Sequence, residues 1–127
     1  MNLVQLLQWQ WKDYGHYHRN RSNLLMHIIA VPMFILGAIL LMVGLYLQSK
    51  LILMPAIASL AISLIVQGRG HKLEAVPPAP FESPANAMSR LLLEQLVTFP
   101  RFVLSGGWAR NLAASAMPAA QDDAVKN

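Results

Sequence analysis

The feature that most constrains the fold is a long apolar stretch, Leu24 to Leu47, interrupted by a single histidine, His27. Such a stretch is long enough to cross a bilayer as a tilted helix. A second apolar stretch covers residues 51–66 and reaches the lower limit for a span when residues 67–68 are included. Only a short polar turn at residues 48–50 separates the two stretches. The sequence therefore predicts a transmembrane helical hairpin.

The composition supports a membrane protein. The chain has 127 residues, of which 55% are hydrophobic and only 13% are charged, about half the charged share of a typical soluble domain. It contains no cysteine, which excludes disulfides, zinc–thiolate sites and iron–sulfur clusters. The net charge is +4, but the basic residues are scattered singly beside the apolar stretches. This pattern favours contact with anionic lipid and argues against a nucleic-acid partner.

The segments on either side of the hairpin predict amphipathic helices that lie at the membrane surface. Residues 1–17 combine helical spacing of leucines with tryptophans, which prefer the headgroup region. Four prolines within residues 72–84 exclude a regular helix there. Asn86 is then predicted to cap a second interfacial helix that extends to about residue 104. We thus expect one all-α membrane domain, residues 1–112, and a disordered tail, residues 113–127.

The distribution of basic residues predicts the orientation. Lysines and arginines precede the first span and follow the second, whereas the turn between them holds only Lys50. Because positive charge is retained on the cytoplasmic side, both termini are predicted to be cytoplasmic.

The hairpin has a geometric consequence for the histidines. His27 and His71 are equally far in sequence from Ser49, the centre of the turn, so two antiparallel helices would return them to the same depth. A break at residues 20–22 lets the chain turn, so that His18 can approach the same point. The sequence therefore predicts three imidazoles close together on the cytoplasmic side.

These three histidines share a local pattern, because each follows a hydrogen-bonding residue by four positions. The pairs are Tyr14 with His18, Asn23 with His27, and Gln67 with His71. An imidazole that binds a metal is normally held through its second nitrogen by a neighbour of this kind. Neutral imidazoles with a carboxylate or water suit iron, zinc or copper.

Several alternatives remain at this point. His16 alone is best read as a polar side chain at the interface, whereas His27 lies inside an apolar stretch and needs a partner. The cluster could hold a structural metal in a non-enzymatic membrane adaptor. It could also provide two axial ligands to a haem, or line a quinone pocket.

The same residues form a pattern that resembles a known family, the small membrane dioxygenases of 2-hydroxy fatty acids. The family includes the fungal enzyme of phytosphingosine breakdown and bacterial homologues. The resemblance covers about residues 10–104 and rests on two motifs. They are Tyr14-x3-His18-x4-Asn23-x3-His27-x4-Pro32 and Gln67-x2-Gly70-His71-x2-Glu74-x3-Pro78.

The resemblance implies an Fe(II)-dependent reaction with O2 that shortens a 2-hydroxy fatty acid by one carbon, as in fatty acid α-oxidation. It implies that the iron ligands are His18, His27 and His71. Glu74 would be a fourth ligand or a base beside the metal, and Asn23 and Tyr14 would orient imidazoles.

A substrate of this kind has a carboxylate that needs a cationic partner near the metal. Arg19, Arg69 and Lys72 are the candidates, because they lie beside the histidine motifs. The resemblance to the bacterial branch suggests the bacterial inner membrane as the location. A homo-oligomer is compatible with these features.

Overall fold

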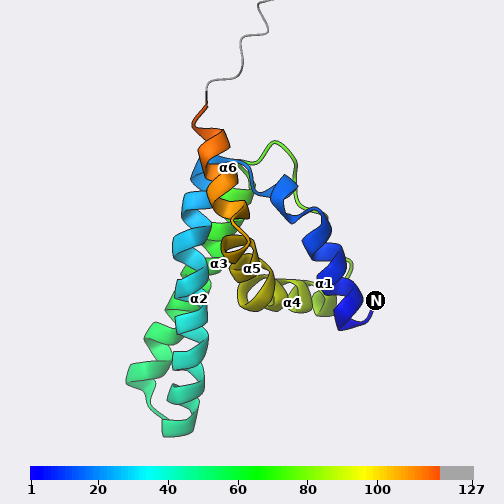
Figure 1. Cartoon of the computed structure of the whole chain (residues 1–127). Coiled ribbons are helices and arrows are strands. Elements are labelled where there is room, and N and C mark those ends of the chain that lie inside the picture. Colours follow the sequence, from blue (N-terminus) through cyan, green and yellow to red (C-terminus); the bar gives the residue numbers. More distant parts are fainter. Residues whose placement is uncertain (118–127) are drawn as a thin grey trace, which may run out of the picture.

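The structure is a computed structural model, which describes residues 1–117. Its two longest helices are α2 (Arg21–Leu47) and α3 (Lys50–His71), which pack against each other side by side and run antiparallel (Figure 1). The turn between them places Gln48 in the left-handed conformation, with φ 51°. The described residues form helices and connecting turns, with no strand among them. The all-α prediction is therefore confirmed.

Small and hydroxylated residues let α2 and α3 approach closely. A Cβ atom added to Gly37 would lie 3.1 Å from the Ser59 Cβ atom. The Ser59 hydroxyl donates to the Met33 carbonyl at 2.9 Å, and the Ser63 hydroxyl donates to the Ala30 carbonyl at 2.6 Å. These bonds satisfy the hydroxyls of buried Ser63 and half-buried Ser59 inside an apolar contact.

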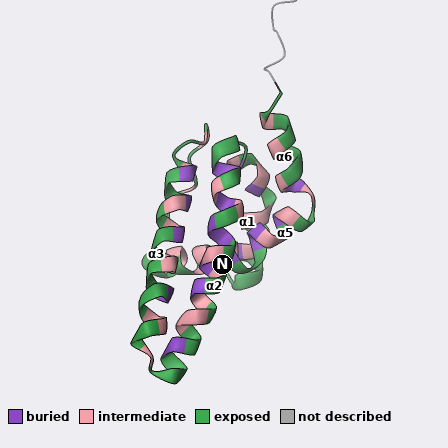
Figure 2. Cartoon of the chain, turned by 90° about the vertical axis from the view of Figure 1, so that its left-hand side faces the viewer, coloured by how far each residue is buried: buried purple, intermediate pink, exposed green. Residues whose placement is uncertain are grey.

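Both long helices are apolar enough to cross a membrane, by length and composition. Their outward side chains are largely exposed, as Figure 2 shows for the lower part of the pair. Ile29 is 70% exposed and Leu51 is 90% exposed. The two helices therefore differ from the core helices of a soluble protein, which bury their apolar surface.

The N-terminal segment is shorter than predicted. Helix α1 spans Leu3–Lys12 and begins at a capping box, in which Asn2 and Gln5 bond reciprocally. A 3-10 turn, η1 (Tyr14–Tyr17), follows it. The prediction of one helix to residue 17 was thus wrong, because the chain bends after Lys12 to bring Tyr14 into the interior.

The C-terminal part is a nearly continuous helical segment with a bulge. It comprises α4 (Pro84–Leu93), the π-helical turn η2 (Glu94–Thr98) and α5 (Phe99–Leu104). Ser83, rather than the predicted Asn86, caps its start, because the Ser83 hydroxyl accepts from the Asn86 N–H. Helix α6 (Gly107–Ser115) extends into the predicted tail, whose residues 118–127 lie outside the described residues.

A compact core fixes these segments against the upper half of α2. Its buried members are Tyr14, Leu24, Val31, Phe99 and Phe102. The Trp108 indole N–H adds a bond of 2.9 Å to the Leu24 carbonyl. As a result, η1, η2 and the ends of α2 and α3 meet at one place.

Candidate metal centre

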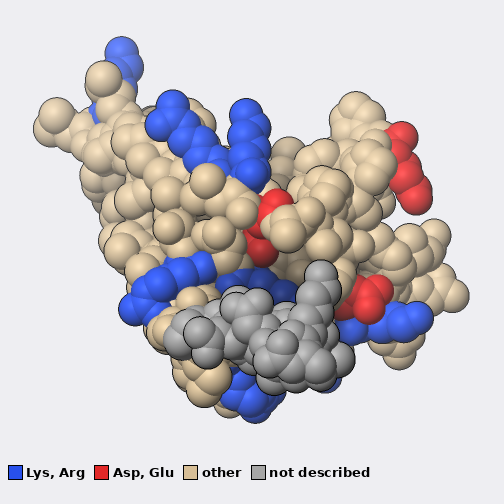
Figure 3. Space-filling view, turned by 90° about the horizontal axis from the view of Figure 1, so that it is seen from above, with Lys and Arg blue, Asp and Glu red and all other residues tan. Residues whose placement is uncertain are grey.

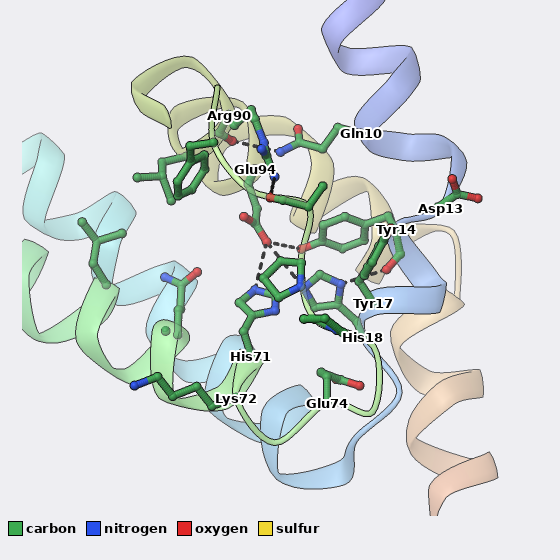
Figure 4. A pocket seen from close by; sticks show the side chains of 18 of the residues that line it. Gln10, Asp13, Tyr14, Tyr17, His18, His71, Lys72, Glu74, Arg90 and Glu94 are labelled. Atoms are coloured by element: carbon green, nitrogen blue, oxygen red, sulfur yellow. Dashed lines mark hydrogen bonds and ion pairs between the residues drawn. The ribbon is translucent and has the colours of Figure 1, made fainter. Parts of the chain in front are cut away.

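Three histidines and one glutamate meet where these elements converge. They are His18, His27, His71 and Glu94, and each offers one ligand atom within 4.8 Å of the others. The Nε2 atoms lie 3.5 Å (His18), 3.9 Å (His27) and 3.9 Å (His71) from the Oε1 atom of Glu94. The three ring centroids are 4.8 to 4.9 Å apart. The hairpin, together with the turn before α2, thus brings the three imidazoles together, as the sequence spacing predicted. Figure 4 shows two of them, His18 and His71, beside Glu94.

Backbone carbonyls set the protonation of two rings. His18 Nδ1 lies 2.8 Å from the Tyr14 carbonyl oxygen, and His27 Nδ1 lies 3.0 Å from that of Asn23. Because a carbonyl can only accept, each Nδ1 atom carries a hydrogen and each Nε2 atom presents a lone pair. Neither Nε2 atom has a hydrogen-bond partner among the described residues. Each lone pair therefore faces the centre of the group.

Tyr14 contacts both the carboxylate and an imidazole. Its hydroxyl donates to Glu94 Oε1 at 2.9 Å, and its ring stacks on His18 with centroids 4.0 Å apart. Burial, followed by the charge of Glu94 and this hydrogen bond, raises the pKa of Tyr14 well above its ordinary value. The phenol thus stays protonated and keeps its bond to the carboxylate.

Glu94 is half-buried and ionised. Desolvation by itself would raise its pKa, but the close contact with His18 and the electrostatic effect of the three neighbouring histidines outweigh it. The resulting pKa is about 2. The group therefore offers an anionic oxygen together with imidazole nitrogens at neutral pH.

The π-helical turn directs Glu94 inward. In η2 the Phe99 N–H bonds to the Glu94 carbonyl, five residues earlier. The extra residue in this turn shifts the phase of the helix, so that Glu94, Gln95 and Phe99 all face the interior. Sequence analysis missed Glu94 because a regular 3.6-residue period groups it with polar Arg90 on an outer face. The available signal was an acidic residue within a stretch of leucines.

A reciprocal amide pair joins η2 to α3. Gln67 donates to Gln95 at 2.9 Å, and Gln95 donates back to Gln67 at 2.8 Å. Gln67 also donates to Ser63 at 3.0 Å. Gln67 precedes His71 by one helical turn, and Gln95 follows Glu94 directly. The Gln67–Gln95 bonds therefore fix the distance between His71 and Glu94.

Glu74 lies outside the group, at the turn between η1 and α2. Its carboxylate accepts from the backbone N–H groups of Arg19 and Asn20 at 3.0 to 3.1 Å, and from the Asn23 side chain at 2.7 Å. The fourth position expected of Glu74 is therefore held by Glu94. Glu74 instead ties the turn that carries His18 and His27 to the end of α3.

Asn23 is buried and packs beside Gly70 of α3. A Cβ atom at Gly70 would collide with the Asn23 side-chain oxygen. Asn23 therefore orients His27 through its backbone carbonyl, while its side chain holds Glu74.

A cavity of about 570 Å³ opens beside the group. Tyr14, His18, His71 and Glu94 line it on the side of the cluster. The rest of the lining combines apolar side chains, such as Leu64, with further polar ones, such as Gln67 and Arg90. Lys72 is the only predicted carboxylate partner that lines this cavity. Arg19 and Arg69 are exposed outside the cavity lining, and the exposed His16 ring packs edge-on against Tyr17.

The donor set fits a metal ion. Two buried imidazole nitrogens without partners point at the half-buried Glu94 carboxylate, an arrangement that is costly unless a cation completes it. Imidazole nitrogens with one carboxylate oxygen are ligands typical of divalent iron, zinc or manganese. Several of these residues also face the cavity, so one side of such an ion would be accessible.

A family comparison agrees with this geometry. The family model described as "2-hydroxy-palmitic acid dioxygenase Mpo1-like" matches residues 4–99. The chain belongs to the Mpo1-like family. No curated protein and no solved structure matches the chain. The residues that match the Mpo1-like model include all four members of the cluster, whereas α6 lies beyond them.

Proposed function

We propose that this protein is an Fe(II)-dependent dioxygenase that shortens 2-hydroxy fatty acids by one carbon. The observation that carries the proposal is the convergence of three imidazoles and a carboxylate at one end of a largely apolar cavity. The description of the Mpo1-like family supports the same substrate class and dioxygenase activity.

His18, His27, His71 and Glu94 would hold the iron. An Fe(II) ion held there would activate O2 for reaction with the 2-hydroxy carboxylate, which itself supplies the electrons that reduce O2. The chain would contribute fixed imidazole tautomers, an ionised Glu94 and a protonated Tyr14 that restrains the carboxylate. Asn23 and Glu74 would keep the two N-terminal histidines in place.

The substrate would lie with its polar end toward Lys72 and its tail along the apolar wall. Lys72 is exposed at the cavity rim, where its ammonium could pair with a carboxylate without being desolvated. Arg19 and Arg69 would act at most from outside the cavity. Apolar lining excludes water from the reaction and favours a long alkyl chain.

The protein would reside in a membrane, with α2 and α3 crossing it. Exposed apolar side chains cover most of both helices. Exposure of an apolar surface of this size to water is unfavourable, and such surfaces are typical of contact with a membrane. Lys and Arg side chains gather at the end opposite the Gln48–Ser49 turn (Figure 3). By the positive-inside rule this end, with both termini, would face the cytoplasm of a bacterial inner membrane.

The arrangement favours catalysis at a single ion over a haem site or a structural metal. The three rings stand nearly perpendicular to one another at 4.8 to 4.9 Å, which leaves no space for a porphyrin between any two of them. A structural metal in an adaptor would be enclosed by protein. Here His18, His71 and Glu94 border a cavity.

The test is metal content and O2 uptake with a 2-hydroxy fatty acid. His27→Ala should abolish both, because His27 is fully buried and its Nε2 atom has no other role. The matched control is His16→Ala, which removes an exposed imidazole outside the cluster and should leave both unchanged. Normal turnover by His27→Ala would overturn the proposal.

A further inference from the structure

The cavity extends well beyond the metal centre. On α3 it is lined by His71 and then, toward the turn, by Gln67, Gly68 and Leu64. Leu64 precedes His71 by two turns of helix, about 10 Å along its axis. The cavity therefore continues from the polar end of α3 into its apolar part.

Gly68 leaves this wall unusually open. A Cβ atom built on Gly68 meets nothing within 4 Å, whereas one built on Gly70 would collide with Asn23. Gly68 is helical, so no special backbone conformation requires glycine there. Glycine inside a helix is less favourable than alanine. Neither packing nor backbone geometry requires glycine at this exposed position, and a larger side chain there would project into the open space beside it.

The opposite wall belongs to α4 and α1. Leu91 of α4 and Trp9 of α1 line the cavity, and α3 makes no extensive contact with either helix within residues 1–117. Figure 1 shows α4 leaving the helical pair sideways. The space between α3 and α4 is thus a trough that is continuous with the metal centre, and its mainly apolar lining includes the polar Gln10 and Arg90 on the wall of α1 and α4.

We infer that this trough, bordered by Leu64, Gly68 and Leu91, receives the alkyl tail of the substrate. Gly68 sets the width of the trough and thereby the preference for long tails. The inference rests on the proposed function, because it assigns the polar end of the same molecule to the cluster. The tail would run along α3 from His71 toward Leu64, parallel to the lipid chains that would surround this helix.

Gly68→Leu tests this inference directly. We compare kcat/KM for 2-hydroxyhexadecanoate and for 2-hydroxybutanoate, which has almost no tail, with metal content measured in parallel. Gly68→Leu should bind metal normally but lower the long-to-short ratio by about tenfold or more, a loss of about 1.4 kcal/mol of selectivity. Gly68→Ala should lower the ratio less. Ala61→Leu adds the same bulk to an exposed position of α3 outside the cavity, and should leave the ratio unchanged.

An unchanged ratio in metal-replete Gly68→Leu would overturn the inference. If Gly68→Leu does not fold, Leu91→Trp narrows the trough from the other wall and must lower the same ratio. Failure of the proposed function would look different, because the wild-type protein would then oxidise neither acid. In that case binding of a spin-labelled fatty acid decides the inference, since wild type should bind it more tightly than Gly68→Leu.

Discussion

At the scale of single residues, two glutamates take different positions at the site, where the sequence predicted only Glu74. Glu94 lies among the imidazoles, while Glu74 accepts four backbone hydrogen-bond contacts at the turn before α2. Only the carboxylate among the imidazoles can contact an ion held there. The other carboxylate acts on such an ion through the position of His18 and His27.

Metal affinity should separate these two roles. Glu94→Gln removes the anionic oxygen from the cluster and should lower affinity by more than about 100-fold, whereas Glu74→Gln should cost about tenfold, as expected of a supporting residue. Titration of the metal-free protein with Fe(II) or Co(II) measures both. Glu82→Gln, which removes an exposed carboxylate from the proline-rich loop, is the matched control. Equal losses for Glu74→Gln and Glu94→Gln would restore Glu74 as a ligand.

At the scale of elements, the π-helical turn η2 is the feature on which the cluster depends. It turns Glu94 and Gln95 inward from a segment whose neighbours Leu92 and Leu96 remain exposed. A π turn is less stable than a regular α-helical turn and persists only where surrounding contacts compensate. The reciprocal Gln67–Gln95 bonds provide that compensation.

A double-mutant cycle on this pair should show strong coupling. Gln95→Leu leaves the buried Gln67 amide oxygen without its donor and should lower the free energy of unfolding by about 1–3 kcal/mol. Gln67→Leu together with Gln95→Leu should recover most of this loss, because neither amide is then left unpaired. Reversible unfolding in detergent gives the free energies, and exposed Gln8→Leu is the control. Additive effects of the two substitutions would refute the pairing.

The same cycle has a second readout in metal binding. The double variant should regain stability but not full metal affinity, since the apolar pair no longer fixes Glu94 relative to His71. A double variant with wild-type affinity would mean that η2 holds its conformation without the amides.

At the scale of the whole molecule, an apolar helical pair carries a polar centre near one of its ends. The exposed surface of α2 and α3 is apolar along the length that leads to the Gln48–Ser49 turn. The remaining helices gather around the other end, where the basic residues also lie (Figures 1 and 3). In the proposed membrane orientation, the centre would stand at the level of the lipid headgroups, where an amphiphilic substrate presents its carboxylate.

Single cysteines can test this orientation, because the natural chain contains none. Leu51→Cys lies at the exposed turn end, and Ala114→Cys lies on exposed α6 at the opposite end. In sealed inside-out vesicles of the bacterial inner membrane, an impermeant maleimide should label Ala114→Cys but not Leu51→Cys. In right-side-out vesicles the pattern should invert. Labelling of both from one side would show that the pair does not cross the bilayer.

Two apolar stretches around a short turn, with His27 and His71 equally distant from it, determined the helical pair and the meeting of the imidazoles. These are local properties, since helix rise and hydrophobic length follow directly from residue order. The sequence motifs also carried the resemblance to the family that the comparison supports. The positions of His18 and Tyr14 depend in addition on the bend of the chain near residue 13.

Tertiary structure alone decided which carboxylate joins the histidines. Glu94 reaches them because a π turn changes the helical phase, and that turn is stabilised by Gln67 from a distant part of the chain. It also decided that Glu74 binds backbone N–H groups and that Lys72, rather than Arg19 or Arg69, borders the cavity. Each outcome depends on contacts between segments far apart in sequence, which no local period encodes.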